Sequence, residues 1–128
     1  MRTTGGPERF RVEIRRRTGE PFRTISDFLE YDHRRLDEIL LDVERLIDRG
    51  ALANAGERFA EFSCGFNRLI DVEERIVFPT FEQVTGMTGG PTVVMRAEHV
   101  EIRRWMALVT VTFAIRMLVS PLDCVSSD

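Results

Sequence analysis

The sequence predicts an all-α fold, an up-down bundle of three long helices. Three stretches place apolar residues at alternating steps of four and three, a spacing that gathers each set on one helix face. Glycine and proline separate the three stretches, and no strand-like alternation outweighs the helical pattern. The three sets are Leu29, His33, Leu36, Leu40, Val43 and Ile47; Phe59, Phe62, Phe66, Leu69, Glu73 and Ile76; and Met95, His99, Ile102, Met106, Val109 and Phe113.

The first helix is predicted from Ser26 to Arg49. Thr24 or Ser26 can cap it, because a hydroxyl oxygen accepts from the unpaired N–H groups of a first helical turn. Gly50 stands where a helix terminator belongs.

The second helix is predicted from Glu57 towards Val84, with interruptions at Gly65 and Pro79. Pro79 lacks a backbone donor and its ring would clash with the carbonyl of Arg75, so a kink is expected there.

The third helix is predicted to open at Pro91, after a turn over 86–90, and to end at Val119 because Pro121 follows. Its stretch 108–119 carries Arg116 as its only charge, and it is shorter than the roughly 20 residues that span a bilayer. We therefore expect a buried helix end or a surface that binds another apolar surface.

The predicted organisation is an arginine-rich arm over 1–23, a bundle over 24–120 and a tail over 121–128. The chain has 128 residues and a formal net charge of -3, which argues against a nucleic-acid binder. Cys64 and Cys124 form no spacing motif and fit a reducing cytoplasm, with Cys64 expected as a small buried hydrophobe. No nucleophile motif or glycine-rich phosphate loop indicates an enzyme.

His33, Glu73 and His99 are the candidate metal ligands, because each interrupts an otherwise apolar face and is predicted to point inward. Two imidazoles and one carboxylate suit iron, manganese or zinc. His33 and His99 are the only histidines in the chain. Asp37 lies one turn after His33 and is a further candidate.

Each candidate has a purely structural interpretation as well. A histidine on an apolar helix face is more often a hydrogen-bonded core residue than a ligand. An unpaired buried Glu73 would cost several kcal/mol, so it would pair with Arg103 or become neutral. Asp37 and Glu74 fit a solvated surface, although Glu74 can substitute as a ligand.

Three segments resemble the motifs of the hemerythrin-like (HHE cation-binding) family. They are 32–36 (Asp-His-Arg-Arg-Leu), 73–79 (Glu-Glu-Arg-Ile-Val-Phe-Pro) and 85–99, which ends in Met-Arg-Ala-Glu-His. The resemblance covers about 25–105. It implies a four-helix bundle with a non-haem di-iron site, in proteins that bind or sense dioxygen, or that handle iron and nitrosative stress. His33 and His99 then correspond to ligands, and Glu73 to a bridging carboxylate.

The chain departs from the family pattern at two places. The histidine expected one turn before Glu73 is Leu69, and no histidine, aspartate or glutamate lies between Trp105 and Asp123. The fourth helix is therefore expected to be shortened or missing, and the chain to hold one iron or none.

Two functions follow. The first is a cytoplasmic non-haem iron protein that binds or senses dioxygen or nitric oxide, or handles iron. The alternative is a metal-free bundle that acts as an interaction or dimerisation module. In both cases three helices leave an apolar seam open, so a homodimer is expected.

Overall fold

The computed structural model describes residues 24–126, with side chains described for 24–118. Its elements are α2 (Ile25–Asp48), α3 (Leu52–Val72), the π-helix η1 (Glu73–Val77), α4 (Phe78–Thr85) and α5 (Pro91–Ser126). The all-α prediction is confirmed. The predicted arginine-rich arm, 1–23, lies outside the described residues.

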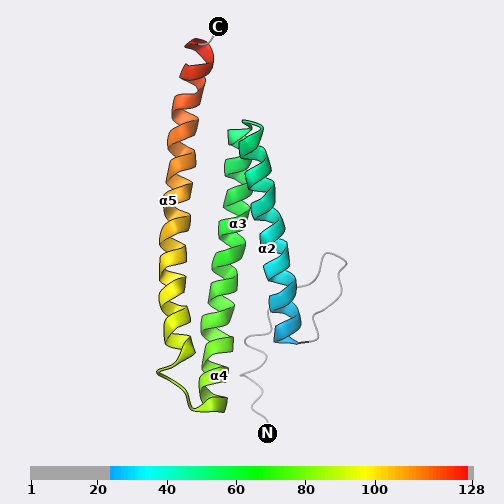
Figure 1. Ribbon diagram of the computed structural model, residues 1–128, viewed down its shortest axis with the longest axis vertical. Coiled ribbons are helices and arrows are strands. Elements are labelled where there is room, and N and C mark those ends of the chain that lie inside the picture. Colours follow the sequence, from blue (N-terminus) through cyan, green and yellow to red (C-terminus); the bar gives the residue numbers. More distant parts are fainter. Residues whose placement is uncertain (1–23, 127–128) are drawn as a thin grey trace.

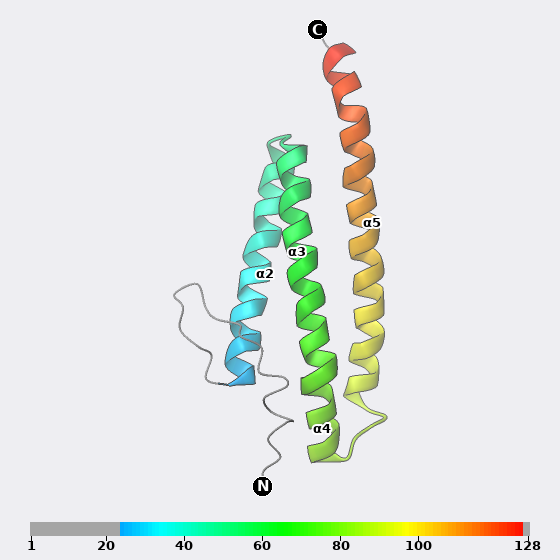
Figure 2. The same cartoon turned by 180° about the vertical axis from the view of Figure 1, so that it is seen from behind.

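The helices lie side by side with α3 in the middle. α2 and α3 form an antiparallel hairpin, η1 and α4 continue α3, and α5 returns along α3 (Figure 1). The view from behind shows the same order, with α5 extending beyond the turn that joins α2 to α3 (Figure 2). This leaves α2 and α5 on opposite sides of α3.

The helix ends follow ordinary capping chemistry. Thr24 is the N-cap of α2, where its Oγ1 accepts a hydrogen bond of 3.0 Å from the backbone N–H of Asp27. Gly50 and Gly86 follow α2 and α4 with φ of +77° and +74°, a left-handed conformation that favours glycine. The predicted cap and turns are confirmed.

Two predicted helix bounds were wrong. α3 begins at Leu52, five residues before Glu57, because the turn after α2 takes only residues 49–51. α5 continues through Pro121 to Ser126. Proline there removes a donor to the carbonyl of Met117, and this carbonyl lies at an exposed part of the helix, where water can satisfy it.

Instead of a sharp kink, a π-helix precedes Pro79. The N–H of Phe78 bonds to the carbonyl of Glu73, five residues back, and Pro79 then falls in the first turn of α4, where its missing N–H costs little. The extra residue in this turn moves the buried face. Phe78 is buried in place of Ile76, which is only partly buried.

The core lies mainly between α2 and α3. The buried face of α2 is displaced by one residue from the predicted one, so that only Leu36 and Val43 are common to both. The clustered apolar side chains are Phe28, Leu36, Ile39, Val43, Ala55, Phe59, Phe62, Leu69, Val72 and Met106.

α2 and α3 approach each other closely at Gly65. A Cβ there would lie 2.8 Å from Cδ2 of Leu36 and 2.7 Å from a guanidinium nitrogen of Arg35, so the glycine lets the helices touch. Cys64 beside it is exposed, which corrects the expectation of a buried thiol, since Gly65 and not Cys64 faces α2.

A Gly65→Ala variant tests this contact. We expect it to lower the free energy of unfolding by about 1–3 kcal/mol, because the buried Leu36 cannot move aside. Urea denaturation followed by circular dichroism measures the change.

Gly56→Ala is the matched control on α3, because a Cβ there meets Phe113 at an ordinary 3.5 Å. It should raise stability by up to about 1 kcal/mol through helix propensity. Equal effects of the two variants would contradict the close-packing account.

Candidate metal centre

His99 lies between two carboxylates. Its Nε2 is 2.9 Å from Oε1 of Glu73, and its Nδ1 is 2.8 Å from Oε2 of Glu74. The side chains of His99 and Glu73 are 8% and 11% exposed, and that of Glu74 is 29% exposed. The packing of α5 against the α3–η1 helix therefore brings three polar groups together in a mostly apolar region.

The π-helix explains why consecutive glutamates reach one imidazole. In a regular α-helix adjacent side chains point about 100° apart, and only one of the pair would face α5. Glu73 and Glu74 open η1, where the turn is wider and holds one more residue. Each carboxylate then approaches a different edge of the ring.

The imidazole ring of His99 is also fixed by an aromatic contact. The Phe78 ring stacks on it with centroids 5.5 Å apart and planes inclined by 17°. The guanidinium carbon of Arg96, one turn before His99 on α5, lies 5.3 Å from the Phe78 centroid, within cation–π range. Phe78 is buried, so it keeps water from the part of the imidazole that it covers.

Glu82 of α4 holds Arg96 in this position. Its carboxylate is 2.7 Å from the Arg96 guanidinium and accepts a second hydrogen bond from the hydroxyl of Thr92. The hydrogen bonds from Arg96 and Thr92 keep the pKa of Glu82 below its usual range, and the same carboxylate raises the pKa of Arg96. The ion pair thus ties the start of α5 to α4 next to the His99 site.

His33 does not point inward, so that prediction was wrong. It is exposed on α2, where its Nδ1 lies 2.8 Å from the backbone carbonyl of Leu29. Its neighbour Asp32 is buried instead, only 1% exposed. Asp37, the further candidate one turn on, is exposed as well.

The burial of Asp32 has an electrostatic reason. Its Oδ1 lies 3.1 Å from Arg35 and 3.9 Å from Arg68 of α3, so two guanidinium groups offset the cost of desolvating the carboxylate. Both possible buried faces of α2 include Leu36 and Val43, and this ion pair favours the one with Asp32.

Arg103 does not pair with Glu73, contrary to expectation. Arg103 donates to Asn67 Oδ1 and to Asp71 Oδ1, each at 3.0 Å, at the more exposed edge between α3 and α5. His99 takes the place of that partner for Glu73.

Phe78, Arg96, Glu82 and Asp32 were not anticipated as part of this chemistry. A usable signal for Phe78 was Pro79, since a proline inside a helix often marks a widened turn and a shifted face. Arg96 and Glu82 pair between two helices, and Asp32 is held partly by Arg68 of α3, and apolar periodicity along one helix does not predict such pairs.

Carboxylate oxygen and imidazole nitrogen are donors that fit iron, but only two of them lie close enough together to bind the same ion. Glu73 and Nε2 of His99 face each other, whereas Glu74 is at the opposite edge of the ring. A carboxylate there orients a metal-binding histidine without touching the metal. Within the part of the chain with described side chains, no three His, Cys, Asp or Glu residues are placed to hold one ion.

Comparison with known families gives one match. The model of the hemerythrin HHE cation-binding domain matches residues 24–126. The chain belongs to the hemerythrin HHE family. A search of curated proteins and a search of solved structures each found no match.

Membership in this family of cation-binding domains agrees with the carboxylate–imidazole pair found between η1 and α5. None of the helices within 24–126 is long and apolar enough to cross a membrane.

Glu82→Gln tests the ion pair beside the site. Because the pKa of Glu82 is lowered on folding, its stabilisation is fully present above the unfolded value of about 4.3 and is lost as the pH falls through the folded pKa. We expect a lower melting temperature than wild type at pH 7, and a difference that shrinks towards zero in acid.

Thermal melts by circular dichroism at pH 7 and at acid pH measure the difference. Glu98→Gln, an exposed glutamate on α5, is the control. A Glu82→Gln effect that does not change with pH would contradict the assignment.

Proposed function

We propose that this protein binds non-haem iron through Glu73 and Nε2 of His99. The supporting observation is the buried contact of 2.9 Å between these groups, with Glu74 at the other ring nitrogen. A cation would replace the proton that Nε2 otherwise shares with Glu73.

The neighbouring residues would prepare this pair for the cation. With the Nδ1 proton of His99 directed at Glu74, loss of the Nε2 proton would leave a lone pair on Nε2 for a cation beside Glu73. The Phe78 ring limits rotation of the imidazole and excludes water from the face that it covers.

Two protein donors would leave several coordination positions of an iron ion to other ligands. When bound, non-haem iron supplies reversible binding of a small molecule such as dioxygen or nitric oxide. We propose binding or sensing of such a gas, or iron handling, by a cytoplasmic protein. The expected load is about one iron per chain.

The remaining ligand predictions stay proposals. His33 would join the site only if α2 rotated, because its side chain is exposed and its Nδ1 already faces the carbonyl of Leu29. Asp37, also exposed, depends on the same rotation. Glu74 is assigned to positioning His99, with direct ligation as a second possibility.

Iron content per chain tests the proposal. After anaerobic loading with ferrous iron and removal of excess metal, elemental analysis should give close to one iron for wild type and a value near zero for His99→Ala, which removes one of two protein ligands. Glu73→Gln should weaken binding at least tenfold.

His33→Ala is the matched control, since it removes the other histidine from an exposed position. Retention of iron in this variant is expected. An equal loss in both histidine variants would mean that α2 supplies a ligand, and wild type without iron would overturn the iron proposal.

Leu69→His tests the geometry in the opposite direction. Leu69 is buried, 1% exposed, one helical turn before Glu73. An imidazole there would face the same region and add a nitrogen donor. We expect iron to dissociate at least tenfold more slowly than from wild type, measured by competition with a chelator.

Leu69→Gln is the control, because glutamine is similar to histidine in volume and polarity but lacks the imidazole nitrogen. It separates the effect of a nitrogen ligand from the effect of a polar side chain at this position. Faster iron loss from Leu69→His than from Leu69→Gln would contradict the placement of the site.

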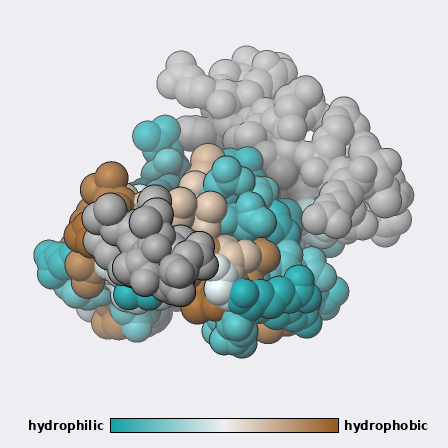
Figure 3. All heavy atoms as spheres, turned by 90° about the horizontal axis from the view of Figure 1, so that it is seen from above, coloured by the Kyte–Doolittle hydropathy of each residue, from teal (hydrophilic) through white to brown (hydrophobic). Residues whose placement is uncertain are grey.

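A metal-free interaction module is the second candidate function, and the exposed apolar surface of α5 favours it. Ten of the fifteen large hydrophobic side chains that are exposed among the described residues belong to α5. Figure 3 shows hydrophobic atoms at the surface on the side where α5 lies. We propose that the protein is a homodimer in solution, with or without iron.

A further inference from the structure

Helix α5 has two apolar faces. The inner face packs on α3 through His99, Ile102, Met106, Val109 and Phe113. The outer face carries Val93, Val100, Leu108, Val111 and Ile115, which are 50–65% exposed. At 100° per residue, the mean directions of the two sets are nearly opposite. No residue of this outer face belongs to the proposed iron site.

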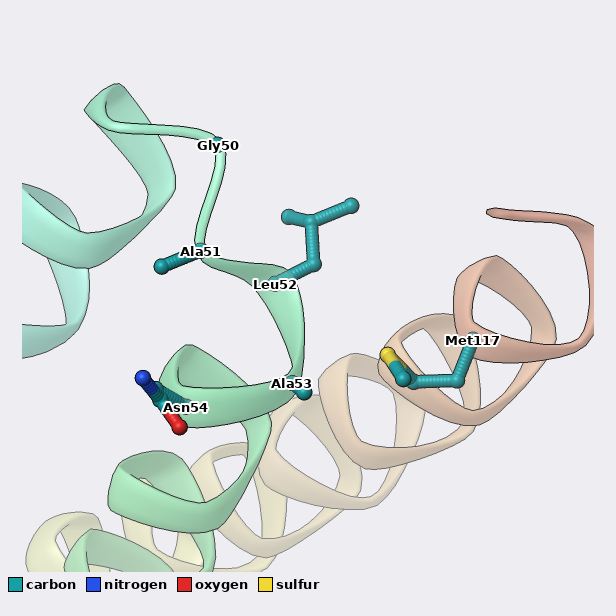
Figure 4. A pocket seen from close by; sticks show the side chains of 6 residues that line it. All are labelled: Gly50, Ala51, Leu52, Ala53, Asn54 and Met117. Atoms are coloured by element: carbon teal, nitrogen blue, oxygen red, sulfur yellow. The ribbon is translucent and has the colours of Figure 1, made fainter. Parts of the chain in front are cut away.

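The inner face makes the apolar contact of α5 with α3, and Arg103 and Trp105 at its edges add hydrogen bonds and a ring contact to α3. At its far end Met117 points towards the start of α3 and lines a cavity of about 260 Å³ with residues 50–54 (Figure 4). No charged side chain lines that cavity. The other helices described in this chain therefore do not cover the outer face.

We propose that the outer face of α5 binds the same face of a second copy of this chain, with the two α5 helices antiparallel. The inference deepens the proposed homodimer by naming its surface and its register, and it does not depend on iron.

Charge complementarity selects the antiparallel register. Glu101 and Arg104 are the charged residues within the outer face, and they form an ion pair of 3.0 Å with side chains about 70% exposed. An antiparallel pair of helices centred between them places Arg104 opposite the partner's Glu101, and Glu101 opposite the partner's Arg104. A parallel pair would place each charge opposite its own copy.

Side-chain size agrees with this register. With the centre between Glu101 and Arg104, Leu108 lies opposite the partner's Ala97, and Ala97 lies opposite the partner's Leu108. Large and small side chains thus face each other on both sides of the charged centre, as close packing of two helices requires.

The area that this pairing would bury can be estimated from the exposed side chains. A fully buried aliphatic side chain removes roughly 60–120 Å² of apolar surface from water. Each copy would bury the five outer-face side chains, Ala97 and the methylene groups of Glu101 and Arg104. Together the two copies would then bury a total of about 1,000 Å², near the lower limit for specific interfaces.

The helices described over 24–118 leave room for the partner. α2 and α3 both lie on one side of α5 (Figures 1 and 2), and the inner face of α5 packs on α3, so the outer face is on the side away from both helices. Two copies can therefore bring their α5 helices together without contact between the α2–α3 hairpins.

The first test is the solution mass of the full chain by analytical ultracentrifugation. Wild type should be a dimer of the 14.8 kDa chain. Val111→Glu should raise the dimer dissociation constant at least about 100-fold, because it puts two carboxylates into the apolar contact. Val84→Glu is the matched control, since Val84 is more exposed but lies on α4, and it should remain dimeric.

Charge exchange tests the register. Arg104→Glu alone should weaken the dimer, since it places a carboxylate opposite the partner's Glu101. The double exchange Glu101→Arg with Arg104→Glu should restore the wild-type dissociation constant. A double variant as weak as the single one would overturn the reciprocal pairing.

Disulfide trapping decides the orientation. In a Cys64→Ser, Cys124→Ser background, mixed Ala97→Cys and Leu108→Cys chains should form the mixed disulfide in preference to either symmetric one. Predominantly symmetric disulfides would contradict the antiparallel arrangement. A monomeric wild type would overturn the dimer itself, whereas a dimer unaffected by Val111→Glu would overturn only this surface, and neither result bears on the iron content of the Glu73–His99 site.

Discussion

The contact of His99 with two carboxylates is the interaction on which the rest of this site depends. An imidazole that meets a carboxylate at each nitrogen is held in one plane and in one direction. It joins α5 to η1 beside the Phe78 ring and the Arg96–Glu82 ion pair, and the imidazole and the two carboxylates satisfy one another. The same arrangement leaves Glu73 and Nε2 as the pair suited to a cation, with Glu74 as the group that orients the ring.

This contact exists because the turn over Glu73–Val77 is a π-helix, which is wider than an α-helical turn. Pro79 cannot donate to the carbonyl of Arg75, and the chain forms a π-helix immediately before it. The wider turn allows consecutive glutamates to reach one ring, and it moves Phe78 into the buried position next to His99. A backbone effect of one residue thus sets the geometry of four side chains.

The sequence predicted the helices well and their orientations less well. Caps and glycine turns are local, so Thr24, Gly50 and Gly86 were predictable. Glu73 and His99 were found from apolar periodicity because each interrupts a long apolar set. His33 was misplaced because two faces of α2 share Leu36 and Val43, and the choice between them depends on the ion pairs of Asp32 with Arg35 of α2 and Arg68 of α3. Interactions between helices of this kind leave no periodic signal. The outer face of α5 was visible only as a generally apolar segment until α3 defined the inner one.

The most direct test of the central claim is the position of iron in crystals of the iron-loaded protein, located by anomalous scattering at the iron absorption edge. The account predicts one peak per chain between the Glu73 carboxylate and Nε2 of His99, within bonding distance of both, with Glu74 still at Nδ1. A peak at His33, or at Nδ1 of His99, would contradict it.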